Sequence, residues 1–152
     1  MIGIYDVLFK LHPKQKMNGS AQILKDFKLR STPSRVAILL TFLERNYALS
    51  HGDVEREVPN TFDRVTVYRT LKTFLDKGLI HKVLDDEGSL KYALCKEACT
   101  TANHHHDHVH FKCTKCGQTN CLQVEIPVIK LPKGYRAKEV NLLIQGICED
   151  CS

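Results

Sequence analysis

Two Cys-x-x-Cys pairs constrain the fold of this chain more than any other feature. Cys113 and Cys116 form the first pair, directly before Gly117, and Cys148 and Cys151 form the second at the end of the sequence. Four thiolates suit Zn²⁺, which binds four ligands tetrahedrally with sulfur at about 2.3 Å. The gap between the pairs exceeds the usual zinc-ribbon spacing and leaves room for a helix or loop and a returning strand. We therefore predict a structural zinc ion that joins two ends of a small domain.

Histidines just before the first pair predict a second metal site of a different kind. Residues 108–112 alternate between polar and apolar, as in a half-buried strand, so His108 and His110 share one face and can bind one ion. The preceding histidines at 104–106 are interpreted as a solvated loop; they are internal, which excludes an expression tag. A zinc hydrolase or deaminase is the alternative from another class. Its H-E-x-x-H or H-x-E signatures are missing, so we predict that the chain is not an enzyme.

Length and charge set the class of protein. With 152 residues the chain can form one ordinary domain or two small ones. No long apolar run or signal peptide is present, so we expect a cytoplasmic protein without membrane contact, in which these cysteines indicate metal rather than disulfides. Residues 1–84 carry 14 Lys/Arg against 8 Asp/Glu, whereas residues 85–152 carry 8 against 9. The N-terminal half is therefore the part expected to meet nucleic-acid phosphates.

Four helices are predicted in the N-terminal half, after an arm at residues 1–19 that has no assigned role. Each follows a residue whose side-chain oxygen can cap the first turn. These expected caps are Ser20 for residues 21–27, Thr32 for a helix that begins at Pro33, Ser50 for a short helix that Pro59 ends, and Asp63 for residues 64–77, which Gly78 ends.

After Gly78 the pattern changes to a period of two. Residues 79–84 and 90–94 are predicted strands, joined by a turn signal at 85–88. Helices followed by a hairpin predict a winged helix-turn-helix, in which the helix before the wing enters the major groove of DNA. The alternative is a helical domain whose last helix simply presents polar residues to water. The outer face of that helix carries Arg64, Thr66, Tyr68 and Arg69.

The order of these features resembles the ferric-uptake-regulator (Fur) family of metal-dependent bacterial repressors. The resemblance covers roughly residues 20–152 and rests on Thr66–Leu71, on the histidine-rich strand that enters Cys113–Gly117, and on Gly146–Cys151. It implies an α+β fold: a winged-helix domain at 20–95, a linker at 96–104 and an α/β dimerisation domain with a four-cysteine zinc site at 105–152. Small domains of this size commonly need such a metal or a partner. The implied partners are a second copy of the chain and an AT-rich inverted-repeat operator in double-stranded DNA.

Matching positions imply the DNA contacts. Tyr68 and Arg69 correspond to base and phosphate contacts of the recognition helix, Arg30 to a basic residue in the minor groove, and Arg35 to a backbone contact. Arginine suits such contacts, and a tyrosine ring can lie against a thymine methyl group. The alternative for Tyr68 is a partly buried core aromatic.

The resemblance also implies a regulatory site that contains His108 and His110. Iron-type members add a glutamate just after the wing, but Tyr92–Leu94 contains no acid. Zinc-uptake-regulator (Zur) members instead use a cysteine at the end of the wing, which Cys95 matches, and an acidic residue fourteen positions earlier, where this chain has His81. Three imidazoles and one thiolate suit tetrahedral Zn²⁺. The resemblance is therefore closest to the Zur type.

Several alternatives stay open for this site. Cys95 can instead be a small buried hydrophobe and His81 a surface residue of the wing. A sensor of iron or peroxide that uses His51 and carboxylates is the second hypothesis, and a passive DNA-binding protein with structural zinc only is the third. The family's further metal site falls on Val109 and Val140, which cannot coordinate a metal. The remaining candidate ligands are His51, His106, Asp107, Glu125 and Glu139, whereas Cys99 and Cys121 have no predicted role.

These expectations combine into one mechanism. An exchangeable Zn²⁺ or Fe²⁺ ion, with Zn²⁺ favoured, ties the wing to the dimerisation domain and so fixes the spacing of two recognition helices. Half-sites lie about 34–36 Å apart on DNA, so this spacing decides whether both helices dock. The predicted function is a metal-sensing transcriptional repressor that controls metal homeostasis.

Overall fold

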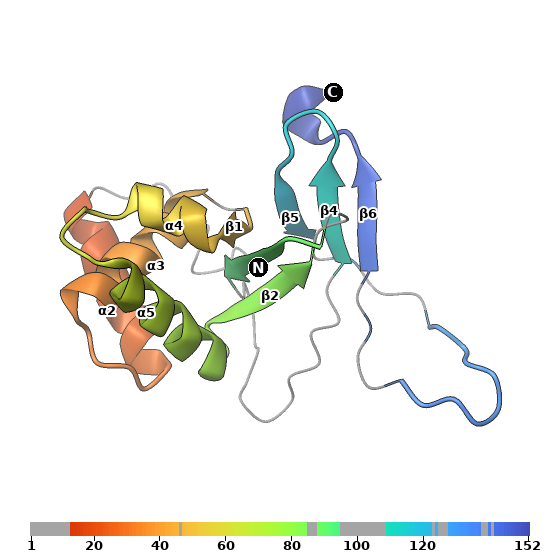
Figure 1. Ribbon diagram of the computed structural model, residues 1–152, viewed down its shortest axis with the longest axis horizontal. Coiled ribbons are helices and arrows are strands. Elements are labelled where there is room, and N and C mark those ends of the chain that lie inside the picture. The colour runs from red at the N-terminus through yellow and green to blue at the C-terminus, as the bar shows by residue number, and fades with distance from the viewer. Residues whose placement is uncertain are drawn as a thin grey trace.

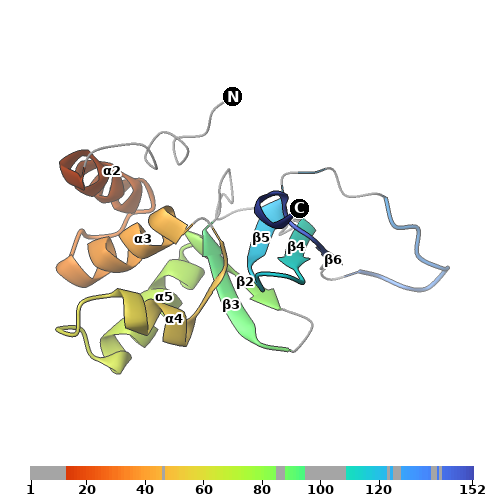
Figure 2. The same ribbon diagram turned by 90° about the horizontal axis from the view of Figure 1, so that it is seen from above.

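The computed structural model describes residues 13–45, 47–84, 88–94, 109–122, 124, 128–137, 140 and 142–152. A helical unit with a small sheet lies beside a second sheet near the C-terminus (Figures 1 and 2). Within the described residues no helix is both long and apolar enough to span a lipid bilayer. The elements in chain order are α2 (Pro13–Asp26), α3 (Pro33–Arg45), β1 (Leu49–Ser50), α4 (His51–Glu57), α5 (Arg64–Asp76), β2 (Ile80–Leu84), β3 (Leu90–Leu94), β4 (Val109–Cys113), β5 (Thr119–Leu122), β6 (Leu142–Gly146) and a 3₁₀ turn, η1 (Glu149–Cys151).

The N-terminal unit has the predicted combination of helices and a wing. Strands β2 and β3 pair antiparallel from Ile80 opposite Leu94 to Leu84 opposite Leu90. The turn at 85–87 lies outside the described residues. A third strand, β1, joins the outer side of β3 and was not predicted, because two residues are too short to produce a periodic pattern.

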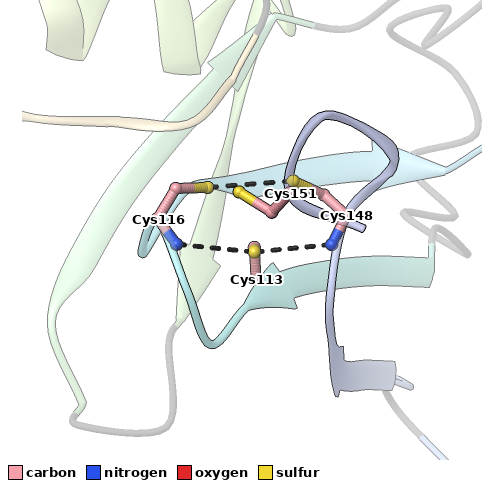
Figure 3. Close-up of side chains that lie close together, drawn as sticks. All are labelled: Cys113, Cys116, Cys148 and Cys151. Carbon is pink, nitrogen blue, oxygen red and sulfur yellow. Dashed lines mark hydrogen bonds between the residues drawn. The ribbon is translucent and has the colours of Figure 1, made fainter.

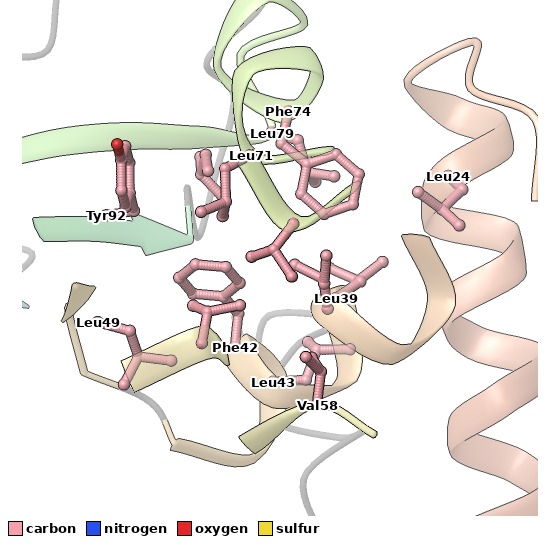
Figure 4. Packing of buried hydrophobic residues seen from close by; sticks show 14 of the residues in the cluster. Leu24, Leu39, Phe42, Leu43, Leu49, Val58, Leu71, Phe74, Leu79 and Tyr92 are labelled. Carbon is pink, nitrogen blue, oxygen red and sulfur yellow. The ribbon is translucent and has the colours of Figure 1, made fainter. Parts of the chain in front are cut away.

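The core of this unit fixes α5, the predicted recognition helix. Leu71 and Phe74 of α5 pack among Leu39 and Phe42 of α3, and Leu24 of α2 closes the far side (Figure 4). All five side chains are buried. Burial of one such side chain contributes roughly 1.5–3 kcal/mol, so α5 is held firmly against the other helices. Its outer face is thereby presented to solvent in one orientation.

The helix starts follow the predicted caps at three of four positions. Thr32 Oγ1 accepts a hydrogen bond from the Arg35 amide at 3.5 Å. Asp63 Oδ1 accepts one from the Thr66 amide at 2.6 Å, and this bond holds the pKa of Asp63 below its ordinary value. The side chain of Ser50 caps α4. These bonds satisfy amides that have no partner inside the helix.

Ser50 and Asp53 form a complete capping box at α4. Ser50 Oγ accepts the Asp53 amide at 3.1 Å, and Asp53 Oδ2 accepts the Ser50 amide at 2.8 Å. Burial pushes the pKa of Asp53 upward, but the hydrogen bonds from Ser50 and the nearby guanidinium of Arg56 outweigh it, so the pKa lies below its ordinary value. The carboxylate is therefore a stable member of the cap at neutral pH.

The predicted cap at Ser20 is wrong. Helix α2 begins at Pro13, and Ser20 lies well inside it, buried, with its hydroxyl donating to the Met17 carbonyl at 2.8 Å. A serine whose hydroxyl bonds back to the preceding turn does not need to end or begin a helix. The polar residues of the first two turns lack an apolar period, which concealed the start at Pro13, a residue favoured in a first turn.

Helix α5 ends as predicted at Gly78. Gly78 donates its amide to the Leu75 carbonyl at 3.0 Å, and Leu79 donates to the Phe74 carbonyl at 2.9 Å. This pair of bonds is a Schellman motif, which requires positive φ at the first residue beyond the cap. Gly78 has φ of 71° and adopts it without steric cost.

Helix α2 ends in the same motif with a different residue. Lys28 donates its amide to the Lys25 carbonyl at 2.9 Å, and Leu29 donates to the Leu24 carbonyl at 2.8 Å. Lys28 has φ of 56° and is the one non-glycine residue with positive φ in the described part of the chain. A side chain in this conformation costs on the order of 1 kcal/mol relative to glycine.

The C-terminal sheet has the order β5-β4-β6, with β4 and β5 antiparallel and β4 and β6 parallel. Parallel neighbours need a long crossover, which residues 123–141 supply. Pro127 and Pro132 in the sequence predict that no uninterrupted helix forms here, and the described residues of this crossover form none. Tyr135 donates its amide to the Pro132 carbonyl at 3.1 Å in a turn. The strand predicted at 108–112 is present at Val109–Cys113, and a second strand, predicted at 138–145 before the last cysteine pair, is present at Leu142–Gly146.

The two sheets touch. Ala48, next to β1, donates its amide to the carbonyl of Thr119 in β5 at 2.8 Å. Ala48, Val83 and Ala93 form a small buried cluster, and Cys121 of β5 packs against it. The wing and the C-terminal sheet therefore share an interior, and side chains on facing strands can meet there.

Replacing Ser50 with alanine should destabilise the protein, because the hydroxyl no longer accepts the Asp53 amide at 3.1 Å or donates to the Asp53 carboxylate at 2.6 Å. We expect a loss of about 1 kcal/mol in the free energy of unfolding, measured by urea denaturation of the zinc-loaded protein. Ser31→Ala, at an exposed position between α2 and α3, is the matched control and should change it by less than about 0.5 kcal/mol. Equal effects of the two substitutions would contradict the capping role.

Candidate metal centres and DNA-reading surface

The four paired cysteines converge at one end of the C-terminal sheet. Cys113 ends β4, and Cys116 follows in a tight turn that Gly117 permits with φ of 73°. Cys148 directly precedes η1, and Cys151 is its last residue. The four side chains therefore point toward one centre (Figure 3). Their sulfur atoms all lie within 4.8 Å of one another, with 3.9 Å between those of Cys116 and Cys148. The predicted four-cysteine cluster is thus present.

Charge is unevenly distributed among these thiols. Cys113 Sγ accepts the amides of Cys116 at 3.5 Å and Cys148 at 3.4 Å, and these bonds lower the pKa of Cys113 to about 6. A hydrogen bond to Cys113 raises the pKa of Cys148, and one to Cys148 raises the pKa of Cys151 to about 12. Among Cys113, Cys148 and Cys151, the negative charge is therefore favoured on Cys113 when no cation is bound. All four sulfurs become thiolates together only around a metal ion.

A second cluster lies between the wing and the C-terminal sheet. His81 of β2 places Nε2 3.2 Å from Nε2 of His110 in β4 and 3.2 Å from Sγ of Cys121 in β5. The imidazoles are only 2% and 4% exposed, and all three ligand atoms lie within 4.8 Å of one another. Ligands at about 2.0–2.3 Å around a tetrahedral ion stand roughly 3.3–3.7 Å apart. The cluster can therefore accept one ion with small shifts of its side chains.

Strand register explains why these residues meet. His110 is directly opposite Cys121 in the antiparallel pair β4–β5, and opposed side chains project on the same face. His81 comes from the other sheet, where its opposite residue is Ala93. The buried apolar side chains of Ala48, Val83 and Ala93 pack against Cys121, so one side of this site is apolar. Two imidazoles and a thiolate in such a site suit Zn²⁺, a borderline-soft ion.

The structure assembles only part of the predicted regulatory set. His81 and His110 lie together, whereas Cys95 and His108 fall outside the described residues. Four further candidates, His106, Asp107, Glu125 and Glu139, also lie outside them. Cys121 is the residue that sequence reasoning missed. The signal for it was the hairpin register: a strand that returns after the Cys113–Gly117 turn brings Cys121 opposite His110.

The predicted DNA-reading residues lie on the exposed face of α5. The Arg64 side chain is 80% exposed and Tyr68 is 57% exposed, so the alternative interpretation of Tyr68 as a core aromatic is wrong. Arg69 is also exposed, whereas Thr66 is half-buried beside its cap. An exposed tyrosine between arginines suits contact with base edges and phosphates.

His51 lies behind this face and not in the metal cluster. Its Nδ1 is 3.3 Å from a carboxylate oxygen of Glu55, whose other oxygen is 3.9 Å from Nε of Arg64. The His51 ring is centred 6.4 Å from the Tyr68 ring. Helix α4 therefore lies next to two of the side chains that are predicted to read DNA, Arg64 and Tyr68.

The α2–α3 connection carries the other predicted contacts. Arg30 is exposed, and Arg35 donates from Nη1 to the Arg30 carbonyl at 2.9 Å, which fixes this segment against α3. The start of α3 and the α4–α5 connection both lie at the end of the helical unit remote from the C-terminal sheet (Figures 1 and 2). The basic residues of both segments can therefore face one partner.

Comparisons with known proteins agree with this arrangement. A family model described as the ferric uptake regulator family matches residues 26–144. The ferric uptake regulation protein of Staphylococcus epidermidis is 31% identical over 140 residues, which are 88% of this chain and 95% of that protein. The zinc uptake regulation protein of Mycobacterium tuberculosis is 32% identical over 132 residues, 81% and 95% of the two chains.

Solved structures show the same fold. A zinc uptake regulator complexed with zinc and DNA superposes with a TM-score of 0.64 and 20% identity, over 93% of this chain and 96% of that one. The Vibrio cholerae ferric uptake regulator gives a TM-score of 0.54 and 21% identity, over 84% and 98%. On the family match and the relatives above 30% identity, the chain belongs to the ferric uptake regulator family, whose members are metal-responsive transcription regulators and not enzymes.

Proposed function

We propose that this chain is a zinc-sensing repressor that binds operator DNA as a dimer when an ion occupies the His81–His110–Cys121 cluster. The observation that carries the proposal is the position of His81 Nε2, 3.2 Å from a ligand atom on each of two strands of the other sheet. An ion there bonds to the wing and to the C-terminal sheet at once. It therefore fixes the winged helix relative to the second domain.

The three ligands contribute differently to this coupling. His110 and Cys121 sit on one hairpin, so they hold their geometry wherever the wing lies. His81 alone among the described ligands comes from the wing. Metal shifts a conformational equilibrium only by the difference in its affinity for the two states. The bond to His81 supplies that difference, because it forms only when the two sheets meet.

The donor atoms favour zinc over iron. Imidazole and thiolate suit Zn²⁺, whereas Fe²⁺ sensing by hard oxygen ligands needs carboxylates, and the described cluster contains none. Cys95, the residue after the end of β3, and His108, two residues before His110, are the proposed further ligands. Iron sensing remains the second hypothesis, since the relatives include ferric as well as zinc uptake regulators.

The proposed DNA contacts follow from exposure and charge. Helix α5 enters the major groove with Arg64, Tyr68 and Arg69, and Arg30 enters the minor groove of an AT-rich site, where the potential attracts arginine. The two chains of the proposed dimer each read one half of an inverted repeat. We place this activity in the cytoplasm. The zinc uptake regulator solved with zinc and DNA supports this mode of action by its similarity in fold.

A second copy of the chain is proposed to bind along β6. This strand lies at the edge of the C-terminal sheet in the described part of the chain. It exposes 47% of Ile144, and Ile147 just beyond it is 52% exposed. Apolar side chains on a free strand edge suit pairing with another strand. The four-cysteine site, which offers no open position for chemistry, is assigned to structural Zn²⁺.

Replacing His81 with alanine should separate metal binding from DNA binding. His110 and Cys121 would retain weak zinc affinity, but occupancy would depend much less on the position of the wing, because the one described wing ligand would be lost. We expect the zinc-dependent gain in operator affinity to fall at least tenfold, measured by fluorescence anisotropy at buffered free Zn²⁺, Fe²⁺ and Mn²⁺. His104→Ala is the matched control and should respond as wild type.

Two further variants make this test decisive. Cys121→Ser should weaken zinc binding itself, and Cys95→Ser should do so if Cys95 completes the site, while the four-cysteine zinc remains bound in both. A normal thermal midpoint of the metal-stripped His81→Ala protein excludes simple unfolding. An undiminished zinc response in His81→Ala would contradict the proposal that the ion connects the wing to the C-terminal sheet. Wild-type DNA binding that does not change with any metal would indicate a passive DNA-binding protein.

Zinc binding at the four cysteines should release protons. At pH 7 Cys113 is largely ionised because its pKa is about 6, whereas Cys148 and Cys151 keep their protons because their pKa values are raised. Zinc must displace at least these two protons, so its affinity should fall by about two log units or more per unit decrease in pH. Calorimetry in buffers of different ionisation enthalpy measures the number released. Zinc binding without proton release would contradict this charge distribution. Cys99→Ser is the control and should leave the number of released protons unchanged.

A charge at Ile144 should disrupt the proposed dimer. Ile144→Lys places an ammonium group on the edge strand, where pairing with another chain would bury it. We expect the dimer dissociation constant to rise at least about tenfold, which is 1.4 kcal/mol, measured by analytical ultracentrifugation. Met17→Lys, at an exposed apolar position on α2, is the control and should leave it unchanged. An unchanged dimer in Ile144→Lys would place the interface elsewhere.

A further inference from the structure

Two helices of this chain end in the same Schellman motif but differ in the residue at its left-handed position. Helix α5 has Gly78 there, followed by buried Leu79, whereas α2 has Lys28, followed by buried Leu29. The four capping hydrogen bonds are equivalent and measure 2.8–3.0 Å. Glycine is the residue that this position favours, so the motif itself gives no reason for lysine.

Strained residues persist where the side chain has a use, and the surroundings of Lys28 indicate one. Lys28 and Arg30 are both exposed on either side of buried Leu29. In the described part of the chain no acidic side chain pairs with Lys28. Its charge is therefore available to a partner outside the chain.

The position of Lys28 next to Arg30 identifies that partner. The two residues are at most about 7 Å apart along the backbone. Arg35 fixes the segment by its bond to the Arg30 carbonyl at 2.9 Å, so both basic side chains start from a defined place. An arginine in the minor groove is flanked by phosphates, which follow each strand at about 3.4 Å per step along the helix axis. A long lysine side chain beside it is well placed to reach the adjacent phosphate.

We propose that Lys28 contacts a phosphate of the operator next to the Arg30 site, and that this contact is why a lysine occupies a position built for glycine. The inference rests on the proposed function, since it needs DNA on the face that carries Arg30. It adds a phosphate contact that lies outside both helices of the helix-turn-helix.

The test compares stability with the salt dependence of DNA binding in the full-length, zinc-loaded protein. The probe is a duplex selected from random-sequence DNA by the wild-type protein. Lys28→Gly should raise the thermal midpoint by about 2–4 °C, because strain is relieved. It should also reduce the slope of log affinity against log salt by about 1 per chain, or about 2 for a dimer, with affinity tens of times weaker at about 0.1 M salt.

Two variants serve as controls. Lys28→Arg keeps the charge and should keep the wild-type slope. Lys77→Gln removes an exposed charge at the opposite end of α5 from Arg64 and should leave the slope unchanged. A stabilised Lys28→Gly protein with the wild-type salt slope would overturn the phosphate contact alone. A thermal midpoint below that of the wild type would show that Lys28 is not strained. A wild-type protein without metal-dependent DNA binding would overturn the proposed function and this inference with it.

Discussion

Two buried imidazoles, one from each sheet, meet with 3.2 Å between their nitrogen atoms, and in the proposed mechanism the placement of the predicted DNA-reading helix depends on this contact. Polar ring atoms in a dry, apolar setting are costly unless each has a partner. Between His81 and His110 a cation satisfies both rings at once, with Cys121 as its third neighbour. In the proposed mechanism an ion bound to all three groups holds the two sheets together more strongly than the contacts among the side chains alone, which is the property a switch requires.

The size of such a switch depends on which side of the interface supplies the ligands. To move an equilibrium from 1:99 to 99:1, an ion must prefer one state by roughly 10⁴-fold. A ligand that stays with the C-terminal sheet, as proposed for His108, would strengthen binding in both states and add nothing to that preference. A ligand that moves with the wing, as proposed for Cys95, would strengthen only the closed state. A dimer with one such site per chain then multiplies the preference, because both sites favour the same arrangement.

The features that could be predicted from the sequence are those that depend on residues close together along the chain. The capping box of Ser50 and Asp53 and the stop at Gly78 are determined by residues a few positions apart, and they were predicted correctly. The four-cysteine cluster followed from the chemistry of its residues alone. The prediction of a cap at Ser20 was wrong because a serine hydroxyl can either accept an amide at the start of a helix or donate to a carbonyl of the preceding turn. The sequence does not distinguish these two hydrogen bonds.

The role of Cys121 was not predictable in the same way, because it depends on strand register. A shift of one residue in the pairing of β4 with β5 would turn Cys121 to the opposite face, away from His110. The turn that carries Cys113 and Cys116 sets that register: Cys113 donates its amide to the Gln118 carbonyl at 2.9 Å, and the Gly117 amide donates to the Cys113 carbonyl at 2.9 Å. The proposed structural zinc at this turn and the proposed sensing cluster thus share one hairpin. An ion held by the four sulfurs would keep the hairpin in register, and only in that register can an exchangeable ion find His110 and Cys121 side by side.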